Sequence, residues 1–318
     1  MQAIRTHVAG VDVHKEILAI TILIGAADEK PEVFQFSAET FTEDLMAVGR
    51  KFLDMGVTEV AMESTGVFWK PLYNVWSPMG INITVGQAGH MKNVPGRKTD
   101  MSDSHWIAEL HRCGLIRPSL IPEDEYQRMR LLSRHRTNLV KDRDRVKNRI
   151  QKTLEDGNVK LGTIASDVFG KSGLQVLRTI AEGCTDASVL SSKVTTKIKR
   201  KEEARKALTN CLTTEHIFLI QELMEQFDHL EARIKNAESE LRDKIEPYKD
   251  IVAALDEIPG IDEILAMGII AEATTDMSNF PNERNFAAWA GVAAGNNESA
   301  GKKKDQNVEK ATRTSENC

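Results

Sequence analysis

The feature that most constrains the fold is the stretch from Glu123 to Asp156, which contains neither glycine nor proline. Within it, Leu132, Leu139 and Val146 recur at intervals of seven residues. This spacing is typical of a long helix that packs along one face. A second heptad pattern runs from Ile217 to Ile245. The sequence therefore predicts two long coiled-coil helices in the middle of the chain.

The second pattern places apolar residues on one face of its helix. They are Ile220, Leu223, Phe227, Leu230, Ile234, Ala237 and Leu241. Such a seam suits a partner helix. We expect it to serve in a homo-oligomer, either a dimer or a tetramer.

The first third of the chain alternates between strand and helix patterns. Two β-rich runs with a tight turn between them fill Val8 to Ile24, and a third strand is expected near Glu32 to Phe36. Further on, helical spacing alternates with short apolar runs, at 41–52 (helix), 57–62 (strand), 69–75 (helix) and 81–85 (strand). This order predicts an α/β domain with a mixed sheet.

The end of the chain reads as a small, mostly α-helical domain that begins near Ile251. Between two helix patterns, Pro259-Gly260-Ile261 resembles a helix-hairpin-helix turn, in which backbone N–H groups can bind a DNA phosphate. We therefore predict three parts, residues 1–120, 121–250 and 251–318. No function is predicted for residues 157–215.

Composition narrows the class of protein. No apolar run approaches the roughly 18 residues needed to span a bilayer, and Asp12 interrupts the first apolar segment, so we expect a cytoplasmic protein without a membrane partner. The four cysteines are widely spaced, without a C-x-x-C pair, which indicates neither a disulfide framework nor a zinc site. The net charge of −5 excludes a uniformly basic nucleic-acid coat.

Positive charge is nevertheless concentrated in the first long helix. Between Gln127 and Lys152 ten Lys/Arg residues stand against two Asp, a local net charge of +8. Such a surface suits a phosphate backbone, but a solvated face of a coiled coil is an open alternative. The candidate nucleic-acid contacts here are Arg134, Arg136, Lys141, Arg145, Lys147 and Arg149.

Four acidic residues could form one site. Asp12 lies in the first strand and Glu63 at the end of a later one, so parallel pairing would bring both to one sheet edge. Asp100 and Asp103 are three residues apart near a helix start, on one face. A cage of four carboxylates suits Mg²⁺ or Mn²⁺, which can assist phosphodiester cleavage. Taken singly, each acid is better explained as a helix cap or a solvated charge.

Four segments together resemble the insertion sequence 110 transposase family. They are GVDVHK (10–15), ESTGVFWKPLYN (63–74), HMKNVPGRKTDMSDSHWIAEL (90–110) and GVAAGNNESAGKKK (291–304). The resemblance implies an RNase H-like (RuvC-like) domain whose DEDD residues are Asp12, Glu63, Asp100 and Asp103. It also implies a DNA transposase or site-specific recombinase that uses Ser299 as nucleophile. A structured guide RNA encoded by the element would pair with the DNA of the element ends and the target.

Further candidate contacts to nucleic acid lie next to these motifs. Lys15 follows the first acidic motif, and Arg97 and Lys98 precede Asp100. Gly260 belongs to the expected hairpin turn, and Lys302 and Lys303 follow Ser299. For Lys15, Arg97 and Lys98, solvated surface charge is the alternative.

After Lys304 the chain departs from the family pattern and reads DQNVEKATRTSENC. So polar a tail cannot bury a helix face, and we therefore expect a truncated C-terminal domain. Two alternative functions remain open. One is a RuvC-like metal-dependent nuclease that uses water in place of Ser299, and the other is an inactive nucleic-acid-binding remnant.

Overall fold

The computed structural model describes residues 3–63, 66–86, 103–194, 198–291, 298–299 and 302–303. The chain divides into two compact units. One comprises Met1–Ile121 with Ser278–Cys318, and the other comprises Pro122–Met277. No helix in the described ranges is both long and apolar enough to cross a membrane.

The first unit is built on a five-stranded mixed sheet of order β3-β2-β1-β4-β5. β1 pairs antiparallel with β2, and β2 with β3, whereas β1–β4 and β4–β5 are parallel pairs. The strands are β1 (His7–Val13), β2 (Ile17–Ile24), β3 (Glu32–Glu39), β4 (Glu59–Glu63) and β5 (Asn82–Gly86). The helices are α1 (Thr42–Asp54), α2 (Trp69–Trp76) and α4 (Asp103–Arg112), with a 3₁₀ turn at Ser77–Met79. The predicted α/β unit with a mixed sheet is confirmed.

Helices cover both faces of this sheet. Alternate residues of a strand point to opposite faces. Ala9, Val11 and Val13 of β1 belong to a core completed by Phe52 of α1 and Trp76 of α2. The intervening residues of β1 face α4, and Val8, for example, is buried against Ala108. The centre of the sheet is therefore buried on both sides.

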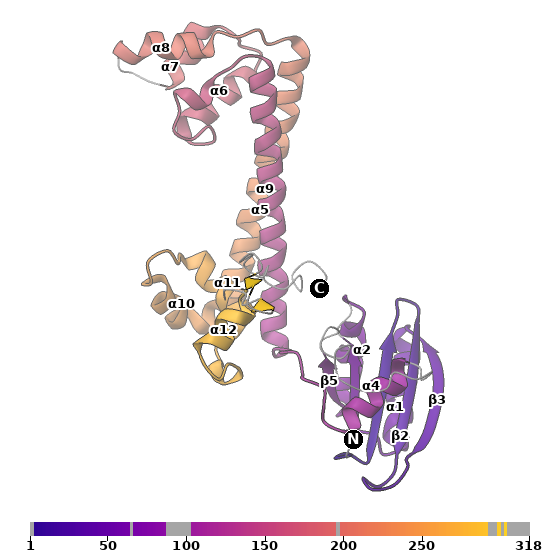
Figure 1. The fold of residues 1–318 in the computed structure, drawn as a ribbon. Helices are drawn as coiled ribbons and strands as arrows, with labels where there is room; N and C mark the ends of the chain where they lie inside the picture. Colours follow the sequence, from indigo (N-terminus) through magenta and orange to yellow (C-terminus); the bar gives the residue numbers. More distant parts are fainter. Residues whose placement is uncertain are drawn as a thin grey trace. The chain divides into compact units, whose positions relative to one another are not determined.

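The second unit is dominated by two long helices, α5 (Asp124–Asp156) and α9 (Thr214–Ile245). Figure 1 shows them running side by side. Arg136 contacts Glu238 whereas Arg143, further along α5, contacts Glu231, earlier in α9. Residues later in α5 therefore contact residues earlier in α9, so the two helices are antiparallel.

The apolar residues of α9 pack inside this unit. Ile220 and Phe227 join Val146 and Ile150 of α5 in one core, and Ile234 meets Leu139 in another. Since the predicted seam is covered within the chain, it does not by itself indicate assembly.

Shorter helices lie at the two ends of the pair (Figure 1). At the end where α5 stops, α6 (Lys171–Ala181), α7 (Ala187–Val194) and α8 (Ile198–Leu208) follow a 3₁₀ turn at Leu161–Thr163. At the other end, α10 (Lys249–Asp256) and α11 (Glu263–Ala273) follow a 3₁₀ turn at Glu246–Tyr248. Met267 and Ile270 of α11 are buried with Met129 of α5.

Later in the sequence come a 3₁₀ turn at Met277–Asn279 and α12 (Glu283–Trp289). The rings of Phe280, Phe286 and Trp289 form an aromatic cluster. Two short antiparallel strands follow, β6 (Glu298–Ser299) and β7 (Lys302–Lys303). The polar tail that we expected to mark a truncation lies outside the described residues.

Candidate active site

Two predicted carboxylates lie at the same edge of the sheet. β1 and β4 pair in parallel with Val11 opposite Met62, and one further step of this register sets Asp12 opposite Glu63. Neighbouring strands are about 4.8 Å apart, and residues at matching positions point to one face. Since both residues stand at the carboxyl ends of their strands, their acidic groups share one edge and one face. Both residues are half-buried.

Helix α4 brings Asp103 to this edge. The carbonyl of Arg112, at the end of α4, accepts hydrogen bonds from the N–H groups of Ile4 and Arg5, just before β1. At the other end of α4, the Ser104 hydroxyl lies 2.9 Å from that of Thr21, which pairs with Gly10. The helix therefore runs antiparallel to β1, and its first residue, Asp103, lies at the edge that carries Asp12.

The close approach of α4 depends on Gly10. A Cβ atom at this position would lie 2.3 Å from the backbone N of Ala108 and 2.3 Å from the carbonyl oxygen of Ser104. No real side chain tolerates such contacts. Glycine therefore lets α4 pack directly on β1, two residues before Asp12.

The donor set at this edge suits a hard divalent cation, because such ions prefer carboxylate oxygens. Asp12 Oδ2 also lies 3.2 Å from Nε2 of His14, the residue that follows β1. Among the residues that the structure describes, no three His, Cys, Asp or Glu side chains gather closely enough to hold a metal ion. Asp100, the fourth predicted ligand, lies outside those residues.

Comparison with family models decides the identity. A model for DEDD transposases of the IS110 type, described as "Transposase", matches residues 9–158. A second model, described as "Transposase IS116/IS110/IS902 family", matches residues 252–315. The chain belongs to the IS110 family of transposases. A comparison with curated proteins finds no match.

Membership assigns the chain to the DNA transposases and recombinases, a class of enzymes that bind DNA. The first match contains the three carboxylates placed above, and a DEDD domain indicates dependence on a divalent metal. The second match contains Ser299 and continues past Lys304.

The predicted nucleophile and the predicted phosphate contacts next to the motifs lie in a hairpin, in a turn or outside the described residues. Ser299 lies in β6 opposite Lys302 of β7, and Lys303 lies opposite Glu298, so the serine belongs to a short hairpin. Lys15 occupies the β1–β2 turn, where its carbonyl accepts a hydrogen bond of 2.9 Å from the Thr40 hydroxyl. Arg97 and Lys98 lie outside the described residues.

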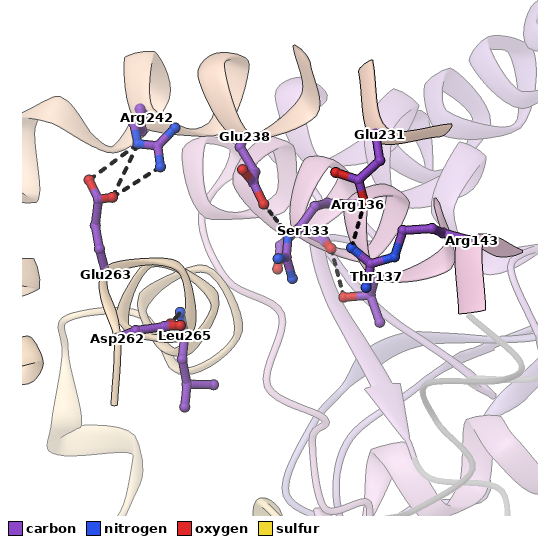
Figure 2. Close-up of polar contacts among 10 residues, drawn as sticks. All are labelled: Ser133, Arg136, Thr137, Arg143, Glu231, Glu238, Arg242, Asp262, Glu263 and Leu265. Atoms are coloured by element: carbon purple, nitrogen blue, oxygen red, sulfur yellow. Dashed lines mark hydrogen bonds and ion pairs between the residues drawn. The ribbon is translucent and has the colours of Figure 1, made fainter. Parts of the chain in front are cut away.

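Several predicted phosphate-binding cations of the transposase face acidic or aromatic partners within the chain. Arg134 makes two hydrogen bonds to the Glu272 carboxylate, of 2.8 and 3.0 Å. Arg136 bonds Glu238 at 2.9 Å, as Figure 2 shows. Lys147 lies 5.2 Å from the centre of the Phe169 ring. These cations hold the helices together.

The remaining predicted cations of α5 face outward. Lys141, Arg145 and Arg149 are all exposed. Arg145 bonds Asp142 of its own helix at 2.6 Å, and Arg149 bonds the neutral side chain of Gln226 at 2.9 Å. The structure thus separates the basic helix into an inner, structural set and an outer set that faces solvent.

Gly260 lies in the turn between α10 and α11, with φ of +92° and open space where a side chain would stand. The N–H of Leu265 donates to the Asp262 side chain, which caps α11 (Figure 2). A backbone turn with an exposed glycine thus joins the two helices.

The groups that organise these sites were not predicted from the sequence. Gly10 carried a signal, because a glycine inside a strand often marks the close approach of another backbone. The acidic partners Glu231, Glu238 and Glu272 carried a weaker one, since acids beside a heptad seam often pair with cations across it.

Proposed function

We propose that the chain is a metal-dependent DNA transposase that cleaves and exchanges strands with Asp12, Glu63, Asp100 and Asp103 as metal ligands and Ser299 as nucleophile. The observation that carries this proposal is the shared sheet edge, where Asp12 stands beside Glu63 and α4 delivers Asp103. The match to a DEDD transposase model over residues 9–158 supports it.

The sheet supports an RNase H-like, RuvC-like domain in residues 1–120. Three antiparallel strands continue into two parallel ones, in the order β3-β2-β1-β4-β5. In the proposed division, a coiled-coil region (121–250) and a C-terminal transposase domain (251–318) follow. α11 packs on α5, so the helical region would carry the first part of the C-terminal domain.

The proposed cofactor is Mg²⁺ or Mn²⁺, held by the four carboxylates. When bound, such ions stabilise the charge on the attacking and leaving oxygens of a phosphodiester. The sheet fixes the separation of Asp12 and Glu63, because both belong to paired strands. Asp103 is fixed by α4, whose position depends on Gly10.

Ser299 would attack phosphorus through its hydroxyl oxygen. A new P–O bond to the serine forms as one P–O bond to a deoxyribose breaks, and the departing sugar oxygen takes up a proton. The serine proton must pass to a base, and carboxylates are the proposed acceptors. The product is a covalent protein–DNA ester that a second DNA end can resolve.

The proposed partners are the DNA of the element ends and target, a structured guide RNA from the element, and further copies of the chain. The outward cations of α5 and Lys15, Arg97, Lys98, Gly260, Lys302 and Lys303 are the proposed backbone contacts. Guide pairing would then choose the sequence, while the protein binds shape and phosphates.

The test uses purified full-length chain, DNA carrying both element ends, the flanking-element RNA and Mg²⁺. Asp12→Asn and Glu63→Gln should abolish strand cleavage while leaving DNA binding intact, and Ser299→Ala should abolish the covalent ester. Glu59→Gln is the matched control, because Glu59 lies on β4 at the opposite end of the strand.

Three results would contradict the proposal. Cleavage that survives Ser299→Ala without an ester would select a RuvC-like nuclease that uses water. Cleavage unaffected by Asp12→Asn would remove the carboxylates from the chemistry. Nucleic-acid binding without any cleavage, indifferent to metal, would leave a binding remnant.

A further inference from the structure

A groove at one end of the long helix pair places exposed apolar side chains beside outward cations of α5. It measures about 700 Å³ and lies between α5 and α9. α5 contributes Arg149 and Lys152, and α9 contributes Phe218 and Leu219. The two apolar side chains are 60% and 48% exposed. Cations beside an exposed aromatic side chain suit a ligand that carries both phosphates and flat apolar faces.

The cations of the groove continue a stripe along α5. Lys141, Arg145, Arg149 and Lys152 are all exposed, and at 100° per residue they fall within an arc of about 80°. In the described part of the chain, Arg145 is the member of the stripe that forms an ion pair with a carboxylate, that of Asp142. The stripe is about 16 Å long, because its first and last members are 11 residues apart in a helix that rises about 1.5 Å per residue.

The α9 side of the groove has a different chemistry. Beside Phe218 it presents the carboxylates of Glu222 and Glu225. Carboxylates repel phosphates but accept hydrogen bonds from the exocyclic amines of bases, and an aromatic ring stacks on the face of a base. The groove therefore offers one side for a phosphate backbone and the other for bases.

We propose that this groove binds an unpaired strand of DNA, with phosphates along Lys141, Arg145, Arg149 and Lys152 and a base stacked on Phe218. Only an unpaired base can present its face to a protein ring, because duplex bases are stacked on one another. This inference rests on the proposed strand exchange, the step that exposes single-stranded DNA in a transposase.

The test measures anisotropy of a fluorescein-labelled, mixed-sequence oligodeoxynucleotide against full-length chain across a salt series. Asp12→Asn is the background throughout, so that binding is measured without cleavage. Phe218→Ala should weaken binding roughly 5- to 150-fold without changing the slope of log affinity against log salt. Arg149→Ala with Lys152→Ala should weaken binding and reduce that slope by about 1.4.

The matched control is Arg233→Ala with Lys235→Ala, which removes two exposed cations of α9 outside the groove. It should leave affinity and slope unchanged. Because Phe218 is exposed, its loss should not lower the unfolding temperature, and circular dichroism verifies this for every variant.

Several outcomes would overturn the proposal. One is a Phe218→Ala variant that binds like its parent. Another is tighter binding of duplex DNA or single-stranded RNA of the same sequence, since either would assign the surface to a different ligand. A third is a dimer that Phe218→Ala dissociates without loss of DNA binding, which would assign the groove to a second copy. Because DNA binding is measured without cleavage, failure of the groove proposal can be distinguished from failure of the proposed strand cleavage.

Discussion

Removing the Glu272 carboxylate should loosen the attachment of α11 to α5. Arg134 bonds both carboxylate oxygens of Glu272, and Arg130 Nε lies 3.0 Å from one of them. The three side chains are only 18–31% exposed. Arg130 also donates a 2.6 Å hydrogen bond to the Glu272 carbonyl, at the end of α11. One carboxylate thus neutralises two arginines where the helix ends.

The size of the effect follows from this partial burial. Exposed ion pairs contribute roughly 0.2–1 kcal/mol, whereas breaking a buried pair costs about 3–5 kcal/mol. Glu272→Ala leaves two half-buried arginines without their carboxylate, but Arg130 keeps its backbone carbonyl. We therefore expect a loss of about 2 kcal/mol in the free energy of unfolding. For a unit of this size, that lowers the unfolding temperature by about 4–8 °C.

The assay is thermal and urea unfolding of the full chain, followed by circular dichroism, for Glu272→Ala, Arg134→Ala and the double variant. A coupling energy of about 1 kcal/mol or more would isolate the Arg134–Glu272 interaction from other effects. Arg145→Ala is the matched control, because Arg145 is 74% exposed and also ion-paired, and it should cost less than about 0.5 kcal/mol. If Glu272→Ala costs no more than this control, or if the two single effects simply add, the Glu272 carboxylate does not hold α11 to α5.

Three further predictions concern the first unit. Gly10→Ala should destabilise it by about 1–3 kcal/mol by forcing α4 away from β1, as thermal unfolding would show, whereas Gly162→Ala should be nearly neutral because its nearest neighbour lies 3.9 Å from the added carbon. Burial, assisted by the charge of Arg5, lowers the pKa of His111 from 6.5 to about 4. The unfolded chain therefore binds the extra proton first, and stability measured by urea unfolding should fall by roughly 3 kcal/mol as pH drops from 6.5 to 4, a dependence that His111→Leu should flatten. Chelation by EDTA should abolish strand cleavage without lowering the unfolding temperature; cleavage that persists would exclude the metal.

Much of the first unit could be predicted because its pattern is local. Strands buried on both faces give continuous apolar runs, and amphipathic helices give their own spacing, so most elements lie where expected. The fourth strand begins at Glu59, later than the predicted residue 57. The reason is a turn after α1, in which the Val57 N–H donates to the Phe52 carbonyl at 2.8 Å. Val57 is buried and therefore looks like a strand residue in the sequence.

Which cations of the basic helix face solvent could not be predicted, because a count of charges does not say where each side chain points. The local net charge of +8 in residues 127–152 did not reveal that Arg136 and Arg143 face Glu238 and Glu231. Those partners lie 102 and 88 positions away, and they come together only through the antiparallel register. The apolar pattern of α9 had the same ambiguity, since a heptad seam fits a helix of the same chain as well as one from another copy.

Because α5 and α9 are antiparallel, the length of the helix pair can be changed without changing the first unit. Deleting seven residues from each helix at facing positions would keep every remaining apolar and charged pair in phase, and would shorten the pair by about 10 Å. A deletion in only one helix would shift all pairs beyond it. Matched deletions or insertions of whole heptads would therefore change the separation between the α6–α8 end and the α10–α11 end without altering the carboxylate edge in the other unit.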